Sequence, residues 1–286
     1  GVPAGEHGIV GYSLREPVSG QIINHLKDWQ PLVDLEQWQK SDTVFETARS
    51  HGVSSLSQGE PRFESSDFTK AVWRGADFQG ARSLREQFEN ARDFCDANER
   101  GLAYLYWPDL DRTGHGSGSE SDSWLHRLEE LDSQLAEFAG MLGPQVGLII
   151  TSDHGMVDVP HDNKMVVDGD SPLLEGVSAW AGEPRAPQLY LSPAAPREIL
   201  LNRWRESVGD RAQVVTREEL IANGVLGNVA PEVEERLGDI VILCETSLVV
   251  YHGPTSSPKS QSMVGQHGSI TPREREVPVI LTGAWA

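Results

Sequence analysis

Between residues 71 and 152, short apolar runs alternate with segments of helical periodicity. Apolar side chains recur every three or four positions over 84–95 and again over 124–142, which predicts two amphipathic helices. The segments 102–107 and 146–150 are short and almost wholly apolar, which is typical of strands buried on both faces of a parallel sheet. This alternation of strands and helices predicts an α/β fold with a mostly parallel central sheet flanked by helices.

Residues 161–251 differ from the preceding part of the chain. Gly, Pro, Asn and Asp are frequent there, and the predicted elements are short. Thr216 and Glu219 have the spacing of a capping box and predict a short helix. We therefore expect an inserted smaller α+β region over 161–251, with 1–160 and 252–286 forming the α/β core.

The charge composition argues against two classes of binding partner. The chain has 286 residues, with 24 Lys and Arg against 43 Asp and Glu, so its formal net charge is −19. Such a charge repels a polyphosphate backbone and an anionic membrane surface, which argues against a nucleic-acid scaffold as partner. No apolar stretch approaches the roughly 20 residues that a membrane helix needs.

The number of cysteines does not determine the cellular compartment of the protein. Cys95 and Cys244 are the only cysteines, too few for a disulfide scaffold. A low cysteine content favours an intracellular or unanchored protein, although a secreted protein with few cysteines fits the composition as well. The sequence carries no signal for the oligomeric state.

Carboxylate and imidazole side chains follow two of the predicted strands. Asp111 and His115 come after the first strand, and Asp153 and His154 come after the second. A third imidazole, His267, lies shortly before the last predicted strand, 277–281. Ligands of open parallel sheets bind at the carboxyl edge, where these residues are expected. Mixed oxygen and nitrogen donors suit Zn²⁺, with Mn²⁺ or Fe²⁺ as alternatives.

Each of these signals also has an ordinary structural explanation. Asp111 and His115 could be a helix cap and a surface imidazole, Asp153 and His154 an ordinary turn, and His267 a loop residue. Three such signals in one chain, each flanked by glycine, favour a metal site. We expect glycines to let the backbone turn sharply so that neighbouring side chains converge: Gly114, Gly116, Gly155 and Gly268. Five other histidines lack this context and are expected to be structural or exposed: His25, His51, His126, His161 and His252.

Taken together, three segments resemble the type I phosphodiesterase/nucleotide pyrophosphatase branch of the alkaline phosphatase superfamily. They are the runs Tyr106–His115, Thr151–Met156 and Gln266–Ser269. The opening run, Gly1–Gly11, is similar to that branch's Thr-Gly-x-x-Pro-x-x-His-Gly-Ile-Val-Gly stretch. The resemblance spans residues 1–283 and is weakest between 161 and 251. It implies an alkaline-phosphatase-like sandwich fold.

The resemblance also implies a dinuclear zinc site and a reaction. Asp111, His115 and His267 would hold one zinc ion, and Asp153 and His154 would help to hold the second. The enzyme would hydrolyse a small-molecule phosphodiester or a nucleotide pyrophosphate bond through a covalent intermediate on Thr or Ser. That nucleophile and a further metal-binding Asp belong to segments expected upstream of Gly1. The family gives this role to none of the hydroxyl residues inside the motifs: Thr113, Thr151 and Ser152.

The sequence also allows other functions. A phosphomonoesterase, a phosphomutase or a sulfatase of the same superfamily is one alternative, although the imidazole of His154 favours a zinc site over the calcium site of many sulfatases. A non-catalytic metal-binding remnant is another. The region 161–251 could form a lid or wall that selects the leaving group.

Overall fold

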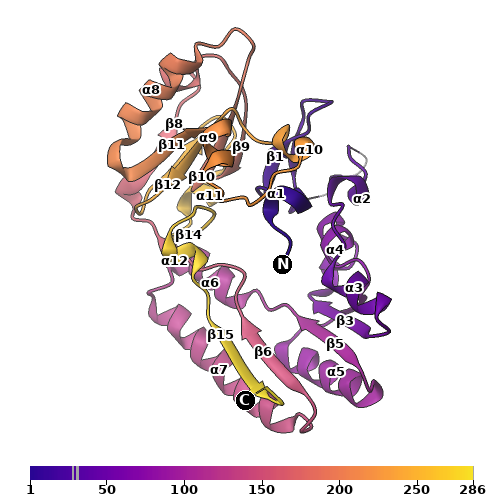
Figure 1. Cartoon of the computed structure of the whole chain (residues 1–286). Coiled ribbons are helices and arrows are strands. Elements are labelled where there is room, and N and C mark those ends of the chain that lie inside the picture. The colour runs from indigo at the N-terminus through magenta and orange to yellow at the C-terminus, as the bar shows by residue number, and fades with distance from the viewer. Residues whose placement is uncertain (28, 30–31, 286) are drawn as a thin grey trace. The chain divides into compact units, whose positions relative to one another are not determined.

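The computed structural model describes residues 1–27, 29 and 32–285 (Figure 1). Contacts within the chain divide it into two compact units. The first unit comprises residues 1–25, 113–121 and 154–277, and the second comprises 26–112, 122–153 and 278–286. In the part of the chain that the structure describes, no helix is both long enough and apolar enough to cross a membrane.

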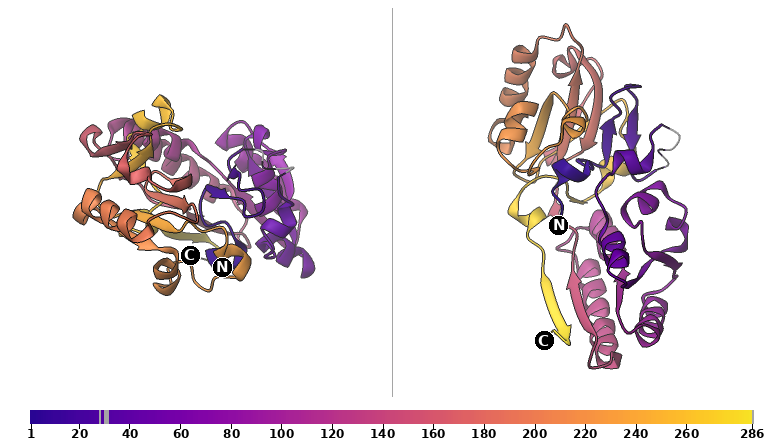
Figure 2. Two further views of the ribbon diagram at one scale, coloured as in Figure 1. Left: turned by 90° about the horizontal axis from the view of Figure 1, so that it is seen from above. Right: turned by 45° about the vertical axis from the view of Figure 1, so that its right-hand side comes forward.

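The second unit contains a three-stranded parallel sheet in the order β4-β3-β5. Two helices predicted from periodicity are confirmed here as α5 and α7, and they meet through the stacked rings of Phe88 and Phe138, whose centroids lie 4.2 Å apart. In Figure 1 and in the right-hand view of Figure 2, α7 runs alongside the β6–β15 pair. The elements of this unit are α2 (Leu35–Trp38), α3 (Val44–Ser50), β3 (Ser54–Gly59), η1 (Pro61–Phe63), α4 (Asp67–Val72), β4 (Asp77–Gly80), α5 (Leu84–Ala97), β5 (Gly101–Leu105), α7 (Asp122–Met141), β6 (Gly147–Thr151) and β15 (Val279–Gly283).

The strand predicted over 146–150 is present as β6, but its environment differs from the expectation. Among the described residues β6 pairs only with β15, and that pairing is antiparallel. Ile149 is 50% exposed, so the prediction of a strand buried on both faces is wrong for this strand. An apolar run predicts that a strand forms, but it does not specify the direction of its partner or what covers each face.

The first unit contains a four-stranded antiparallel sheet in the order β11-β12-β10-β9. Helix α8 packs on this sheet through Trp204 and Leu200, which are fully buried. The capping box predicted at Thr216 and Glu219 is confirmed at the start of α9, because both of its hydrogen bonds are present. The elements of this unit are α1 (Ala4–His7), β1 (Ser13–Arg15), β2 (Ile22–Asn24), β7 (Val157–Asp158), η2 (His161–Asn163), β8 (Lys164–Val167), η3 (Pro172–Leu174), β9 (Val177–Glu183), β10 (Ala186–Leu191), α8 (Arg197–Val208), η4 (Gly209–Arg211), β11 (Ala212–Thr216), α9 (Arg217–Ala222), α10 (Pro231–Glu234), β12 (Ile240–Cys244), β13 (Val249–His252), α11 (Pro258–Ser262), β14 (Gly265–Gln266) and α12 (Pro272–Arg275).

The segment 161–251 lies wholly within the first unit and has the mixed helices and short strands expected of it. Its definition as a separate subdomain stays a prediction. One helix belongs to both units: α6 (Asp109–Ser117) begins in the second unit and ends in the first.

The packing of α8 gives a test of the core. The Trp204 side chain is fully buried, and its indole N–H donates to the Leu173 carbonyl at 3.0 Å. Trp204→Ala is expected to lower the free energy of unfolding by about 3–5 kcal/mol, because it opens a large cavity. Ile199, on the same helix, is 54% exposed, so Ile199→Ala should change stability by no more than about 0.5 kcal/mol. Urea denaturation followed by circular dichroism compares the two, and equal losses would contradict this account of the core.

Candidate metal centre

Helix α6 carries the first pair of predicted ligands. Asp111 and His115 are four residues apart, so their side chains lie one turn apart on the same face of the helix. The sequence predicted a sharp turn here, and that prediction is wrong because Gly114 and Gly116 lie inside the helix. Asp109 and Asp111 occupy the first turn, where negative charge favours the helix by interacting with its dipole.

The glycines beside the predicted ligands have two different roles. Only Gly268 among the four has a positive φ, of 120°, so the expected sharp turn is confirmed there and not at Gly155. At Gly155 the requirement is space: a Cβ atom would lie 2.0 Å from the carbonyl oxygen of Arg273. Gly155 therefore lets two backbone segments approach each other closely, which a sequence pattern alone does not distinguish from a turn.

Three imidazoles gather within the first unit. His115 comes from α6, His154 from the segment after β6, and His267 from the loop after β14. The ring centroids of His115 and His267 lie 5.2 Å apart, and those of His154 and His267 lie 3.5 Å apart with nearly parallel planes. Residues from three separate segments of the sequence thus form one cluster, which we call the imidazole cluster.

Hydrogen bonds define which ring nitrogen of two of these histidines can bind a metal. Nδ1 of His115 lies 2.8 Å from the Gly265 carbonyl, and Nδ1 of His154 lies 2.8 Å from the Gly155 carbonyl. A carbonyl oxygen only accepts, so both Nδ1 atoms carry a proton. In the neutral form of each ring, Nε2 is then the nitrogen with the lone pair. A backbone carbonyl bonded to the far nitrogen is the usual support of a histidine ligand.

The electrostatics of the imidazole cluster favour the neutral form of the His267 ring. Burial, together with the neighbouring His154, His115 and Arg185, lowers the pKa of His267 to about 3. A neutral imidazole is the form that binds a metal ion. The cluster therefore fits the borderline divalent ion that the sequence suggested.

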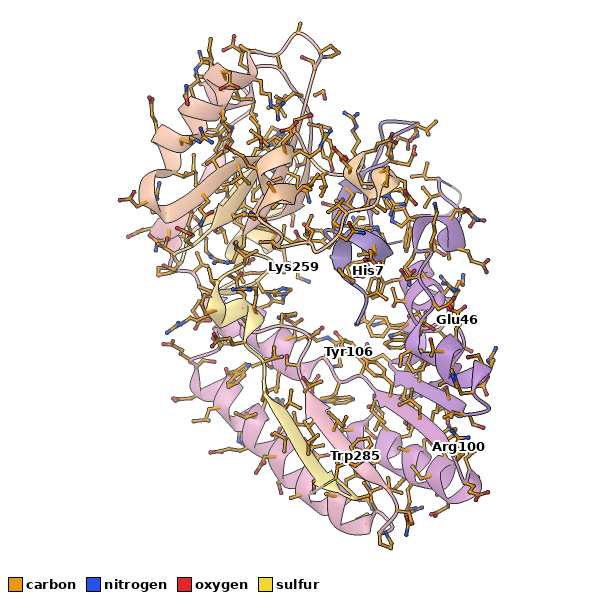
Figure 3. All side chains as sticks on the ribbon, in the orientation of Figure 1. His7, Glu46, Arg100, Tyr106, Lys259 and Trp285 are labelled. Carbon is orange, nitrogen blue, oxygen red and sulfur yellow. The ribbon has the colours of Figure 1, made fainter. Side chains whose placement is uncertain are left out.

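The two predicted carboxylate ligands belong to the second unit. Both act on Tyr106, at the end of β5 (Figure 3): burial raises the pKa of its phenol to about 12, and the negative charges of Asp153 and Asp111 contribute to the increase. Burial and then Asp153 also raise the pKa of Tyr104. Asp153 is bonded directly to His154, and Asp111 precedes His115 by one helical turn. Each carboxylate therefore lies within four residues of a member of the imidazole cluster.

The remaining histidines have local partners. His25 is buried and its Nδ1 donates to the Gly11 carbonyl at 2.7 Å, whereas His126 lies on the exposed part of α7 beside Glu130 at 3.3 Å. His161 is fully exposed. These positions agree with the expectation that they are structural or exposed.

The sequence analysis missed a buried ion pair next to the imidazole cluster. Arg185, immediately before β10, is 0% exposed and contacts Glu274 of α12, which is 3% exposed. An arginine at the start of an otherwise largely apolar strand is one signal that could have found the pair. The capping-box spacing of Thr271 and Glu274 is another, although the Thr271 hydroxyl donates to the Glu274 carboxylate rather than capping α12.

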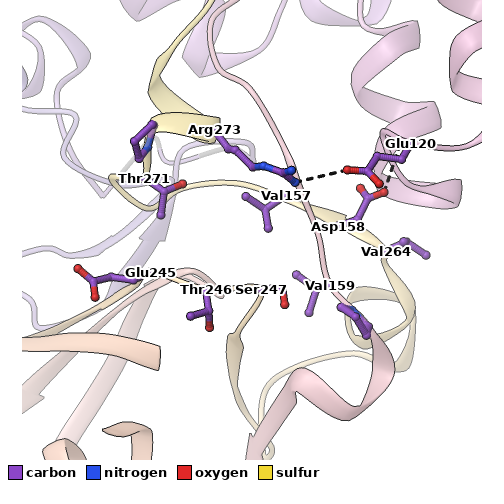
Figure 4. A pocket seen from close by; sticks show the side chains of 12 residues that line it. Glu120, Val157, Asp158, Val159, Glu245, Thr246, Ser247, Val264, Thr271 and Arg273 are labelled. Atoms are coloured by element: carbon purple, nitrogen blue, oxygen red, sulfur yellow. Dashed lines mark hydrogen bonds and ion pairs between the residues drawn. The ribbon is translucent and has the colours of Figure 1, made fainter. Parts of the chain in front are cut away.

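The loop that precedes α12 also borders a hollow of about 720 Å³ (Figure 4). Arg273 and Glu120 form an ion pair of 3.4 Å at its edge, and Asp158 accepts hydrogen bonds from Ser119 and Glu120 beside them. No residue of the imidazole cluster lines this hollow. It is therefore separate from the candidate metal ligands.

Comparison with solved structures confirms the predicted alkaline-phosphatase-like α/β fold. An inactive variant of murine ectonucleotide pyrophosphatase/phosphodiesterase 5, solved in complex with AMP, matches with a TM-score of 0.76 and 17% identity, covering 99% of this chain and 74% of that one. Phosphonoacetate hydrolase from Sinorhizobium meliloti 1021 matches with a TM-score of 0.67 and 17% identity, covering 98% of this chain and 75% of that one.

Curated sequences match over shorter stretches and at higher sequence identity. Bovine bis(5'-adenosyl)-triphosphatase is 32% identical over 95 residues, which are 30% of this chain and 21% of that protein. Human ectonucleotide pyrophosphatase/phosphodiesterase family member 5 is 23% identical over 174 residues, 59% of this chain and 36% of that protein. The chain thus spans between a fifth and about a third of the length of these relatives.

The family model of type I phosphodiesterase/nucleotide pyrophosphatase matches residues 1–270, nearly the whole chain and all three members of the imidazole cluster. The chain therefore belongs to the type I phosphodiesterase/nucleotide pyrophosphatase family.

Proposed function

We propose that this protein is a metal-dependent hydrolase of phosphodiester or nucleotide pyrophosphate bonds in small molecules. The observation that carries the proposal is the gathering of His115, His154 and His267 in a member of this family. A nucleotide substrate is supported by the names of two similar proteins: the murine structure holds AMP, and the bovine relative is a bis(5'-adenosyl)-triphosphatase.

The proposed ligands divide between two ions. Asp111, His115 and His267 would hold one ion, and Asp153 and His154 would help to hold the other. The mixture of carboxylate oxygen and neutral imidazole nitrogen supports zinc, with Mn²⁺ or Fe²⁺ as alternatives. The carbonyls that bind Nδ1 of His115 and His154 would orient both rings for metal binding through Nε2.

When bound, a pair of ions supplies charge that activates a nucleophile, binds phosphoryl oxygens and stabilises the leaving oxygen. The nucleophile in this proposal is a Thr or Ser upstream of Gly1, where the family also has a further metal-binding Asp. Its hydroxyl oxygen would displace the leaving group and form a covalent phosphoryl or nucleotidyl ester, which water then hydrolyses. The region 161–251 would form part of the wall that selects the leaving group.

The first test compares an aryl phosphodiester with the matching monoester. The native protein, with any segment that precedes Gly1, is assayed for release of the phenol in the presence of zinc. We expect the diester to be hydrolysed with the higher kcat/KM, because a site that holds a nucleotidyl group must accept a second ester substituent. A preference for the monoester would favour a phosphomonoesterase, and zinc binding without turnover of either ester would favour the non-catalytic remnant.

A second prediction concerns His267. His267→Ala should lower the zinc content of the purified protein and abolish turnover, because it removes a ligand from the centre of the imidazole cluster. His126→Ala is the matched control: His126 is exposed on α7, beside Glu130, and its loss should change neither zinc content nor turnover. Metal analysis by mass spectrometry measures the first effect. Full zinc occupancy in His267→Ala would contradict the proposed ligand set.

A third prediction concerns metal removal. Dialysis against a chelator should abolish hydrolysis, and Zn²⁺ should restore it better than Mg²⁺, because Mg²⁺ prefers oxygen ligands. Zinc at 100 times its dissociation constant should also stabilise the folded chain by about 2.7 kcal/mol. Thermal unfolding of the chelated protein with and without zinc measures this. An unchanged melting temperature would argue against metal binding by the folded state.

A further inference from the structure

The strongest unassigned feature near the candidate ligands is the buried ion pair of Arg185 and Glu274. We infer that this pair positions the segments that carry His154 and His267, so that both imidazoles are oriented to bind a metal ion. The inference rests on the proposed metal site, and it assigns a role to two residues that do not themselves bind the metal.

The guanidinium of Arg185 makes a fixed set of contacts. Nε donates to Oε1 of Glu274 at 2.6 Å, and Nη2 donates to Oε2 at 2.9 Å. The other N–H groups donate to three backbone carbonyls, at 2.7 to 3.1 Å: Thr246, Leu248 and Cys244. All five N–H groups of the guanidinium therefore have an acceptor, and Arg185 is fixed to the backbone around β12 and β13.

The carboxylate of Glu274 connects Arg185 to the loop that carries His267. Oε1 also accepts from the backbone N–H of Ser269 at 2.9 Å, and Oε2 accepts from the Thr271 hydroxyl at 2.5 Å. Burial alone would raise the pKa of Glu274, but the hydrogen bonds from Arg185 and Thr271 hold it below its ordinary value. The ionised carboxylate thus fixes the residue two positions after His267.

The backbone of Glu274 makes the corresponding contact with the His154 segment. Its carbonyl accepts from the N–H of Gly155 at 2.8 Å, and no side chain larger than glycine fits at 155. Gly155 is in turn the residue whose carbonyl binds Nδ1 of His154. One residue, Glu274, therefore fixes the segments that carry both stacked imidazoles, and Arg185 fixes Glu274.

The experiment removes the pair without leaving a buried charge unpaired. In the Arg185→Met/Glu274→Gln double variant the net charge is unchanged, and the Gln oxygen can still accept from the N–H of Ser269. The matched control is Arg217→Met/Asp239→Asn, which removes another ion pair of 2.9 Å in the first unit that has no hydrogen bond to residues 154–155 or 267–274. Near-ultraviolet circular dichroism verifies that both variants are folded.

The readout is zinc affinity, measured by titrating the chelated proteins, together with the visible spectrum of bound Co²⁺, which reports ligand geometry. We expect the Arg185→Met/Glu274→Gln protein to bind zinc about tenfold to a hundredfold more weakly, as happens when residues that orient metal ligands are removed, and to have an altered Co²⁺ spectrum. The control variant should match the wild type in both. An unchanged affinity and spectrum in the folded test variant would overturn the inference.

A second variant and the wild-type protein complete the experiment. If the double variant does not fold, Arg185→Lys replaces it, because Lys keeps the charge but lacks the forked pair of donors that matches the carboxylate. Weakened zinc binding by this variant supports the inference, and wild-type affinity overturns it. A wild-type protein that binds no zinc would instead overturn the proposed metal site itself, so the two failures are distinguishable.

Discussion

A buried charge is tolerated only when it is paired and its hydrogen-bonding groups have partners, and this constraint organises the first unit. The guanidinium of Arg185 is fully buried, and its five N–H groups contact Glu274 and three backbone carbonyls. A pair of this kind often adds little net stability, but its geometry is restrictive because each contact fixes a direction as well as a distance. The conformation of the loop over 267–274 follows from that restriction.

The net charge of the chain and the local charge at the imidazole cluster affect the binding of an anionic substrate differently. A net charge of −19 repels an anionic ester at long range. The His267 ring contributes no charge near pH 7, because burial and the neighbouring charges lower its pKa to about 3. In the proposed function, attraction for the ester therefore comes from the bound ions at short range, where a local charge outweighs the distant surface.

The sequence predicted those features that depend on local pattern. Periodicity was sufficient for α5 and α7, and capping-box spacing was sufficient for α9. It did not predict helix α6, because Gly114 and Gly116 have poor helix propensity and indicate a turn instead. The contact of Arg185 with Glu274 joins residues 89 positions apart, so no local pattern contains it.

In the proposed function, the region 161–251 helps to select the leaving group. The same contacts would then allow substrate preference to change while the proposed ligands stay in place. Arg185 belongs to the segment 161–251, which differs in composition from the rest of the chain. The guanidinium of Arg185 nevertheless contacts backbone carbonyls and the side chain of Glu274. Backbone acceptors do not depend on which side chains surround them. Surface residues of this segment can therefore be replaced without disturbing the loop that carries His267, provided that the buried pair and the backbone around β12 are retained.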